Sequence, residues 1–396
     1  MINKKVYSIT LLSLLLLSSC AKFSFDDVNE AKLKKTDIMC PVKREKILVH
    51  SENSKLNKRY AKFMQDHKGS LLDNFFKWSL IQLASRPDAT TLNSRTLNFV
   101  KYKGKEFFLV TAPKSSESVS FIVGLEEVRK YYKVRRSLNF YAREIDSKFP
   151  SLIPVSAPIQ NFIERNKVAF YKDKQIRRYV FKGNQIVRQG ESIQSPSFQK
   201  VIRSLKTMNK DVFKVTQLFN ATDKYTCNFD NRLFSSNPIF QRKTNQIKSN
   251  FFGVFVNEDN FFISLTSSMP SSQKYISGEF ILKSHPISSF NAAICSANKG
   301  TEFILAKNLI HSEQLINNVL KSSSSSDGPK EIINLKRHVN LLYPERTIQE
   351  IYGRKKIIDK DRSVYNVPTL GKVDIISYNK GFEIFKEPRT GILKCH

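Results

Sequence analysis

The sequence lacks the short motifs that mark the common enzyme classes. There is no G-x-S-x-G nucleophile elbow, no H-E-x-x-H zinc motif, no P-loop and no glycine-rich dinucleotide fingerprint. Glycine is itself scarce, with 13 in 396 residues. These absences exclude the sequence signatures of α/β-hydrolases, zincins and nucleotide-binding enzymes. The absence of these motifs does not exclude an active site that is assembled from residues far apart in the sequence.

Histidine and cysteine are too scattered to form a metal site of a common kind. None of the six histidines lies in a motif with a nucleophile, and no two cysteines form a C-x-x-C unit. Zinc sites need closely spaced ligand pairs, so we expect no metal and no cofactor. Asp359 and Asp361 form a carboxylate pair two residues apart, but four cations surround them, which predicts a solvated turn: Lys355, Lys356, Lys360 and Arg362.

Acidic residues are outnumbered by basic ones. The chain has 65 Lys and Arg against 35 Asp and Glu, a formal net charge of +30. With 40% hydrophobic residues and 30 Phe it can bury a large core, so the composition predicts a globular protein rather than a disordered one. Its length indicates two domains, or one large domain with additions.

No apolar run is long enough to span a bilayer, which takes about 20 residues. The longest candidate covers residues 9–17 and is interrupted by Thr10 and Ser13. It follows Lys4 and Lys5 and ends in small residues before Cys20. This order predicts an export signal rather than a transmembrane helix.

The ending Leu17-Ser18-Ser19-Cys20 resembles the lipobox of bacterial lipoprotein signal peptides. The resemblance covers residues 1–20 only. It implies cleavage before Cys20 and acylation of this residue with chains such as palmitate, which would anchor the protein stably. In a Gram-negative host of the usual sorting type, Ala21 after the cysteine implies the outer membrane. We expect an envelope lipoprotein facing the periplasm; the alternative is an ordinary secretory peptide with an incidental cysteine.

Four further cysteines, in an exported chain, predict two disulfides. They are Cys40, Cys227, Cys295 and Cys395, and three pairings are open. Closing loops of this length contributes about 3 to 5 kcal/mol each in the chain-entropy model.

The sequence divides into five segments by composition. We expect a signal peptide (1–19), a lipidated tether (20–50), a main α+β domain (51–321), a serine-rich linker or loop (322–329) and a small C-terminal α+β lobe (330–396).

Hydrophobic spacing predicts an α+β fold with a mainly antiparallel sheet. Spacings of three and four predict helices over residues 56–64 and 71–83, with Trp78 in the core. Alternation predicts a hairpin over residues 97–112 about Lys103-Gly104. Further strands are expected at 251–256, 261–266, 276–282 and 292–306, and a meander at 167–188 with turns at Asp173-Lys174 and Gly183-Asn184.

A long amphipathic helix is predicted over residues 196–219, with Ser195 as its N-cap. Apolar residues recur at spacings of three and four on one side. Basic residues occupy the other side: Lys200, Arg203, Lys206, Lys210 and Lys214.

A second basic feature interleaves cations with aromatic residues at positions 129–136. Its members are Arg129, Lys130, Tyr131, Tyr132, Lys133, Arg135 and Arg136. Such clusters bind phosphate-bearing molecules by charge pairing and stacking. The alternative is an ordinary solvated face of a very basic chain.

These observations favour a non-catalytic binding or structural module of the envelope. Its expected partners are the membrane, through the lipid anchor, and an anionic envelope component such as anionic lipid, lipopolysaccharide or peptidoglycan. Nucleic acid is not expected, and the sequence leaves the oligomeric state open. Two alternatives are a lipid-anchored hydrolase acting on envelope polymers or host material, and an accessory subunit of an envelope complex.

Overall fold

The fold is α+β with mainly antiparallel sheets, as the sequence predicts. The computed structural model describes residues 47–216, 219–221, 225–227, 247–276, 278–287, 292–297, 302–307, 318–319, 328–342, 345–351, 363–367, 370–378 and 382–385. Cys20, Cys40, Cys395 and residues 322–327, which carry several sequence predictions, lie outside these ranges.

The larger sheet has seven antiparallel strands. Its order is β1 (Leu48–His50), β11 (Lys248–Asn257), β12 (Asn260–Ile276), β2 (Arg95–Tyr102), β3 (Lys105–Pro113) and β8 (Val212–Val215), while β13 (Glu279–His285) pairs with the long β12. The β2–β3 hairpin is the predicted one, and its turn residues Lys103 and Gly104 both have positive φ. Because β1 belongs to this sheet, the folded body begins within the segment predicted as tether.

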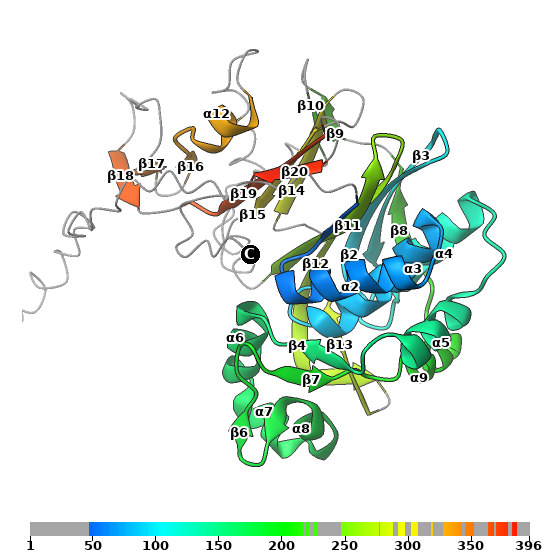
Figure 1. Cartoon of the computed structure of the whole chain (residues 1–396). Coiled ribbons are helices and arrows are strands. Elements are labelled where there is room, and N and C mark those ends of the chain that lie inside the picture. The colour runs from blue at the N-terminus through cyan, green and yellow to red at the C-terminus, as the bar shows by residue number, and fades with distance from the viewer. Residues whose placement is uncertain are drawn as a thin grey trace, which may run out of the picture.

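Helices cover one face of this sheet (Figure 1). They include α2 (Ser54–Asp66), α3 (Leu71–Ser85), α4 (Ser120–Tyr131) and α5 (Leu138–Lys148). The predicted Trp78 core position is confirmed, since the indole is fully buried and its Nε1 donates to the His50 carbonyl at 3.2 Å. In the described part of the chain, no helix is both long and apolar enough to cross a membrane.

Helix α3 begins with a capping box. The Ser70 hydroxyl accepts from the Asp73 backbone N–H, and the Asp73 carboxylate accepts from the Ser70 N–H. Asp73 also accepts from the Tyr141 hydroxyl at 2.8 Å and pairs with Arg136 at 3.2 Å. Burial alone would raise the pKa of Asp73, but these hydrogen bonds and the Arg136 charge lower it overall.

Asp73→Asn is therefore expected to lower the free energy of unfolding by about 1 to 2 kcal/mol at neutral pH. Because the folded-state pKa lies below the ordinary value of 3.8, the contribution is fully present above that pH and is lost as pH falls through the folded value. Urea denaturation of both proteins at several pH values measures this. An equal difference between them down to the lowest pH would contradict it.

A second, six-stranded sheet packs on the other face of the larger one (Figure 1). Its order is β20 (Phe382–Phe385), β19 (Lys372–Tyr378), β15 (Glu302–Lys307), β14 (Ala292–Ala297), β10 (Tyr225–Cys227) and β9 (Phe219–Ala221). Strands β19 and β20 come from the predicted C-terminal lobe, so this part of the lobe completes a sheet of the main body. Cys295 is disulfide-bonded, and Cys227 is its cross-strand neighbour in register. The two disulfides expected among the four cysteines stay a prediction.

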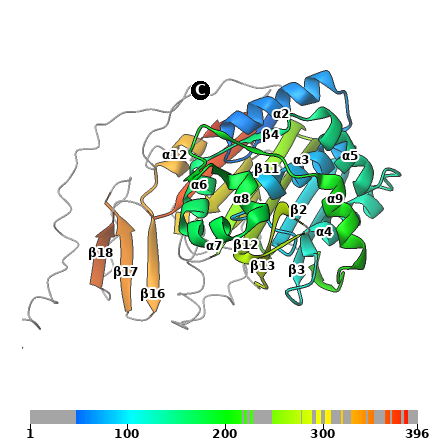
Figure 2. The ribbon, with the colours of Figure 1, turned by 90° about the horizontal axis from the view of Figure 1, so that it is seen from below.

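The rest of the described C-terminal region forms smaller elements. Strands β16 (His338–Leu342), β17 (Glu345–Glu350) and β18 (Ser363–Val367) make a three-stranded sheet at one side of the molecule (Figure 2). Helix α12 (Pro329–Ile333) packs on the outer face of the second sheet, where Ile332 and Ile333 contact the same apolar cluster as Ile304 and Ile375. The body thus has four layers: helices, sheet, sheet and a short helix.

The alternation of side chains along β11 explains the layering. Phe252 and Val254 point to the helices, whereas Phe251 and Phe255 point into the apolar cluster between the two sheets. Both faces of β11 are therefore buried.

The predicted meander at 167–188 is wrong in its first half. Residues 167–180 form two short helices, α7 (Lys167–Lys172) and α8 (Lys174–Val180), followed by the small hairpin β5 (Phe181–Lys182) and β6 (Gln185–Ile186). Asp173 does not turn a hairpin; its side chain caps α8 by accepting from the N–H groups of Gln175 and Ile176. The predicted turn at Gly183-Asn184 does join two strands.

The predicted long helix over 196–219 is also wrong. Helix α9 (Phe198–Ser204) is capped by Ser197 rather than Ser195 and continues only as a 3₁₀ turn (Leu205–Thr207). The chain then joins the sheet edge as β8, where Val212 to Val215 pair with β3. Strand pairing therefore overrides the helical spacing, and the five basic residues do not share one helix face.

Candidate functional site

Two serine hydroxyls meet at the end of the space between the sheets. Ser249 on β11 and Ser267 on β12 lie directly opposite each other, and their Oγ atoms are within hydrogen-bond contact. Ser249 is 8% exposed and Ser267 is fully buried. Because side chains alternate along strands, both point to the same side as Phe251 and Leu265, which lie in the apolar cluster between the sheets.

The row of side chains continues onto the next strand. Arg95, the first residue of β2, lies opposite Ser267. Beyond it is a cavity of about 220 Å³ with a mainly apolar lining, which Arg95 shares with Val110, Ala112, Pro113, Phe213, Val215, Pro286 and Ile287. The hydroxyl pair therefore sits one strand away from a small cavity edged by a guanidinium group.

A buried polar network lies on the opposite, helix-covered face of the sheet, at the same ends of β11 and β12. Arg86 donates to both oxygens of Asp88, at 2.7 and 2.8 Å, and also pairs with Glu52. Asn250 donates to Gln82 Oε1 at 3.1 Å and to Thr90 Oγ1 at 3.2 Å. Buried charges and amides are expensive unless they are paired, so this network fixes the start of β11 against the C-terminal end of α3.

Lys248, the first residue of β11, lies on this second face. Its cross-strand neighbour is Ser268, whose hydroxyl donates to the Asp88 carbonyl at 3.4 Å. Burial lowers the pKa of Lys248, and the charge of Arg165 lowers it further. The amine thus lies across the sheet from the Ser249 hydroxyl, and the strand geometry separates the two groups.

The hydroxyl pair is suited to nucleophilic chemistry. Ser249 is the less buried of the two, and Ser267 is placed to orient its Oγ. Among the described side chains beside Ser249 on this face, Ser267, Phe251 and Arg95 are not bases at neutral pH. A serine in this position needs a base from another source.

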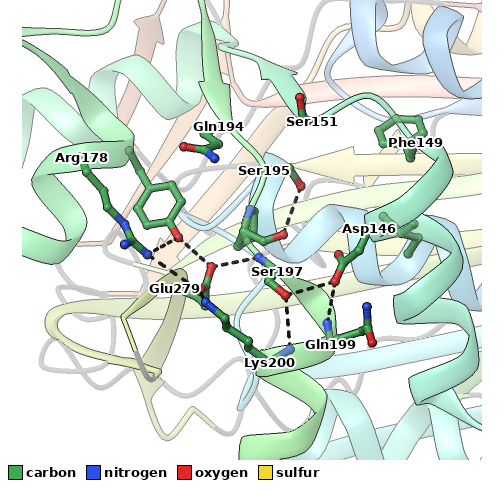
Figure 3. Close-up of a pocket in the computed structure, with 13 residues that line it drawn as sticks. Asp146, Phe149, Ser151, Arg178, Gln194, Ser195, Ser197, Gln199, Lys200 and Glu279 are labelled. Atoms are coloured by element: carbon green, nitrogen blue, oxygen red, sulfur yellow. Dashed lines mark hydrogen bonds and ion pairs between the residues drawn. The ribbon is translucent and has the colours of Figure 1, made fainter.

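A larger, polar pocket lies elsewhere, between α5, α8, α9 and β13 (Figure 3). It measures about 460 Å³. The carboxylate of Glu279 lies at its centre and accepts from the Tyr179 hydroxyl at 2.6 Å, the Ser197 N–H at 2.9 Å and Lys200 Nζ at 3.3 Å. Asp146 faces it and accepts from the N–H groups of Phe198 and Gln199 at the start of α9.

The ionisable groups of this pocket stabilise the start of α9 and are not placed for proton transfer. Both carboxylates are engaged with the first turn of α9, and Arg178 and Lys200 balance their charge. Burial raises the pKa of Tyr179 to about 12, with Glu279 adding to the effect. The phenol therefore stays neutral at physiological pH, and Figure 3 shows it directed at Glu279.

The predicted anion-binding residues 129–136 lie at the C-terminal end of α4 and in the turn before α5. Three of their cations are paired: Arg129 with Glu126, Lys130 with Glu127, and Arg136 with Asp73. Lys133 and Arg135 are exposed. Three of the five cations of this run therefore have a carboxylate partner within the fold.

The two tyrosines of this run pack on the β2–β3 hairpin. Tyr131 donates to the Glu106 carbonyl at 3.0 Å, and Tyr132 donates to the carbonyls of Val100 and Lys105 at 2.8 and 2.9 Å. Burial raises the pKa of Tyr132, with the neighbouring Tyr131 adding to the effect. Their hydroxyls are used within the fold, which leaves Tyr131, the more exposed ring, as the one accessible for stacking.

Sequence reasoning missed Ser249, Ser267 and Arg86. The predicted strands began at 251 and ended at 266, so both serines fell just outside them. The available signal was a run of small polar residues at adjoining strand ends, Ser249-Asn250 and Thr266-Ser267-Ser268. No cluster of metal-ligating side chains occurs among the residues that the structure describes.

Comparison with known proteins finds similarity in structure only. No protein-family model and no curated protein matches the sequence. The structure is similar to that of a cephalosporin acylase from Bacillus halodurans, with a TM-score of 0.53, 10% identity, and coverage of 88% of this chain and 95% of the acylase chain. It is also similar to the structures of LmbA2991T421A and LmbA2991HD, each with a TM-score of 0.51, at 9% and 8% identity, covering 88% of this chain and 98% of theirs. At these identities the likeness concerns the fold.

Proposed function

We propose that the protein is an envelope lipoprotein that hydrolyses amide bonds, with Ser249 as its nucleophile. The observation that carries this proposal is the hydroxyl pair of Ser249 and Ser267 at the end of the apolar layer between two packed sheets. The likeness to an acylase fold supports it, because acylases cleave amides. A hydrolase is therefore the function we propose, in place of the non-catalytic binding module that composition alone favours.

The base in this proposal is the α-amino group of Ser249 itself, as in N-terminal-nucleophile hydrolases. A serine or threonine that begins a chain can use its own amine in this way. Ser249 acquires a free amine if the bond from Lys248 is cut. The Ser249 Oγ attacks the Lys248 carbonyl carbon, the C–N bond breaks, and the amine takes the hydroxyl proton. Water then hydrolyses the resulting ester, which leaves a carboxylate on Lys248 and restores the hydroxyl.

The catalytic cycle repeats this chemistry on a substrate. The Ser249 amine accepts the proton as Oγ attacks the amide carbonyl, and it delivers that proton to the leaving amine. An acyl ester on Oγ remains, and water activated by the same amine releases the acid. Ser267 is a positioning residue, since it orients the attacking oxygen without bonding to the substrate.

The test is hydrolysis of a panel of N-acyl p-nitroanilides by the purified protein, with rapid quenching and peptide mapping. We expect nitroaniline release and a transient acyl group on the peptide that begins at Ser249. Acylation of other residues only, or turnover that is unchanged when Ser267 is replaced by alanine, would contradict the proposal.

The lipid anchor gives a separate prediction. Cys20→Ser is expected to move the protein from the membrane fraction to the soluble periplasmic fraction, because the acylated thiol is lost while the fold is untouched. Fractionation with immunoblotting measures this, and Cys227→Ser serves as the matched cysteine control that stays in the membrane. Retention of Cys20→Ser in the membrane would refute anchoring at this residue.

A further inference from the structure

A groove of about 550 Å³ runs between α4, the start of α5, α9 with its 3₁₀ turn, and β8. We call it the cationic groove. Helices α4, α5 and α9 lie at the same side of the molecule in both overall views (Figures 1 and 2). The groove is separate from the Ser249 site, with which it shares no lining residue.

The floor of the cationic groove is apolar. It is formed by side chains from three helical elements: Val119, Ile122, Val123, Leu138, Ile202 and Leu205. Five of these six are buried and Ile202 is partly exposed. Most of the floor therefore belongs to the core, and only its upper surface faces the groove.

The rim carries five cations and two carboxylates. The cations are Arg129, Lys130, Lys206, Lys210 and Lys214, and the carboxylates are Glu126 and Glu127. Glu126 pairs with Arg129 at 2.6 Å, and Glu127 is shared between Lys130 at 2.9 Å and Lys214 at 3.2 Å. The rim thus has a formal net charge of +3, from five positive and two negative groups.

Lys206 and Lys210 account for most of this excess. Both are exposed, and neither has a carboxylate partner among the described residues. Lys206 belongs to the 3₁₀ turn, and Lys210 lies in the short connection between that turn and β8. Two lysines that gain an anion here lose no existing ion pair.

We propose that the cationic groove binds an anionic membrane lipid, with the phosphate of the headgroup at Lys206 and Lys210 and the adjoining apolar part on the floor. Charge complementarity requires an anion, and the apolar floor requires that this anion be attached to a hydrophobic body. A free polyanion would leave the floor uncovered. The volume lies within the range of ordinary small-ligand sites, roughly 300 to 1,000 Å³.

The cationic groove joins parts of the two basic features that are separate in the sequence. Arg129 and Lys130 come from the run at 129–136, and Lys206, Lys210 and Lys214 come from the stretch predicted as one helix. The fold brings them together because β8, the strand at the sheet edge, pairs with β3 and contacts α4.

The test is vesicle co-sedimentation of the full chain carrying Cys20→Ser, so that the lipid anchor does not contribute. The probes are vesicles of phosphatidylcholine alone and of phosphatidylcholine with phosphatidylglycerol. The test variant is Lys206→Glu with Lys210→Glu. The matched control is Lys167→Glu with Lys172→Glu, which makes the same charge change at exposed positions on α7, outside the groove.

We expect binding to the anionic vesicles only, at least a tenfold loss of affinity in the groove variant, and less than a twofold change in the control. Inorganic phosphate at millimolar concentration is expected not to displace the vesicles, because it cannot use the floor. Equal losses in both double variants would overturn the proposal in favour of general charge attraction. Displacement by phosphate would overturn it in favour of a free-phosphate site.

Discussion

Replacing Ser249 with alanine is expected to abolish amide hydrolysis and to leave the chain uncut at Lys248. Removal of a covalent nucleophile typically costs a factor of about 10³ or more in turnover. The Ser249 hydroxyl is the nucleophile in both chain cleavage and amide hydrolysis, so both reactions are lost together. The measurement is initial rates on the most rapidly cleaved anilide, alongside the intact mass of the purified protein.

Two matched variants separate chemistry from folding. Ser249→Thr keeps a hydroxyl at the same position and is expected to retain cutting and part of the activity. Ser268→Ala removes a neighbouring buried hydroxyl that faces the other side of β12 and is expected to change the rate less than threefold. If Ser268→Ala lost as much activity as Ser249→Ala, the loss would reflect disturbance of the strand ends and not removal of the nucleophile.

Arg86→Met is expected to lower the free energy of unfolding by about 3 to 5 kcal/mol. Methionine fills much of the volume but leaves the buried carboxylate of Asp88 without its two charged donors. A large effect is expected because breaking one side of a buried pair leaves an uncompensated charge. Urea denaturation followed by the fluorescence of Trp78, the only tryptophan, measures it.

Arg136→Met is the control for this prediction. Arg136 pairs with Asp73 at 3.2 Å, but half of its side chain is exposed, so its loss is expected to cost less than about 1 kcal/mol. A similar cost for both arginines would mean that the Arg86 network contributes no more than a surface ion pair.

Elements with local signals could be predicted from the sequence. Helix α3 shows its capping box at Ser70 and a continuous apolar pattern, and the β2–β3 hairpin shows alternation about Lys103-Gly104. In these elements, propensity, pattern and tertiary packing agree. The α+β class could be inferred from such elements.

Elements decided by distant partners could not be predicted. The spacing from Phe198 to Val215 is helical, yet Val212 to Val215 pair with β3, a strand about a hundred residues earlier in the chain. Asp173 is a residue type common in turns, but its tertiary surroundings decide whether it turns a hairpin or caps a helix.

The candidate site was hidden for the same reason. Ser249 and Ser267 are ordinary residues in the sequence. Their significance comes from cross-strand register and from a second sheet built partly by residues 372–378 and 382–385. Sequence features predict an anchor at Cys20 and a cation-rich run at 129–136. They could not place two hydroxyls opposite each other.

The most direct test of the proposed hydrolase is the N-terminal sequence and mass of the fragments in purified wild-type protein. We predict two chains, one ending at Lys248 and one beginning at Ser249 with a free amine, and a single uncut chain in Ser249→Ala. A wild-type chain that stays intact at Lys248-Ser249 under conditions where the protein is folded would contradict the assignment of Ser249 as the nucleophile.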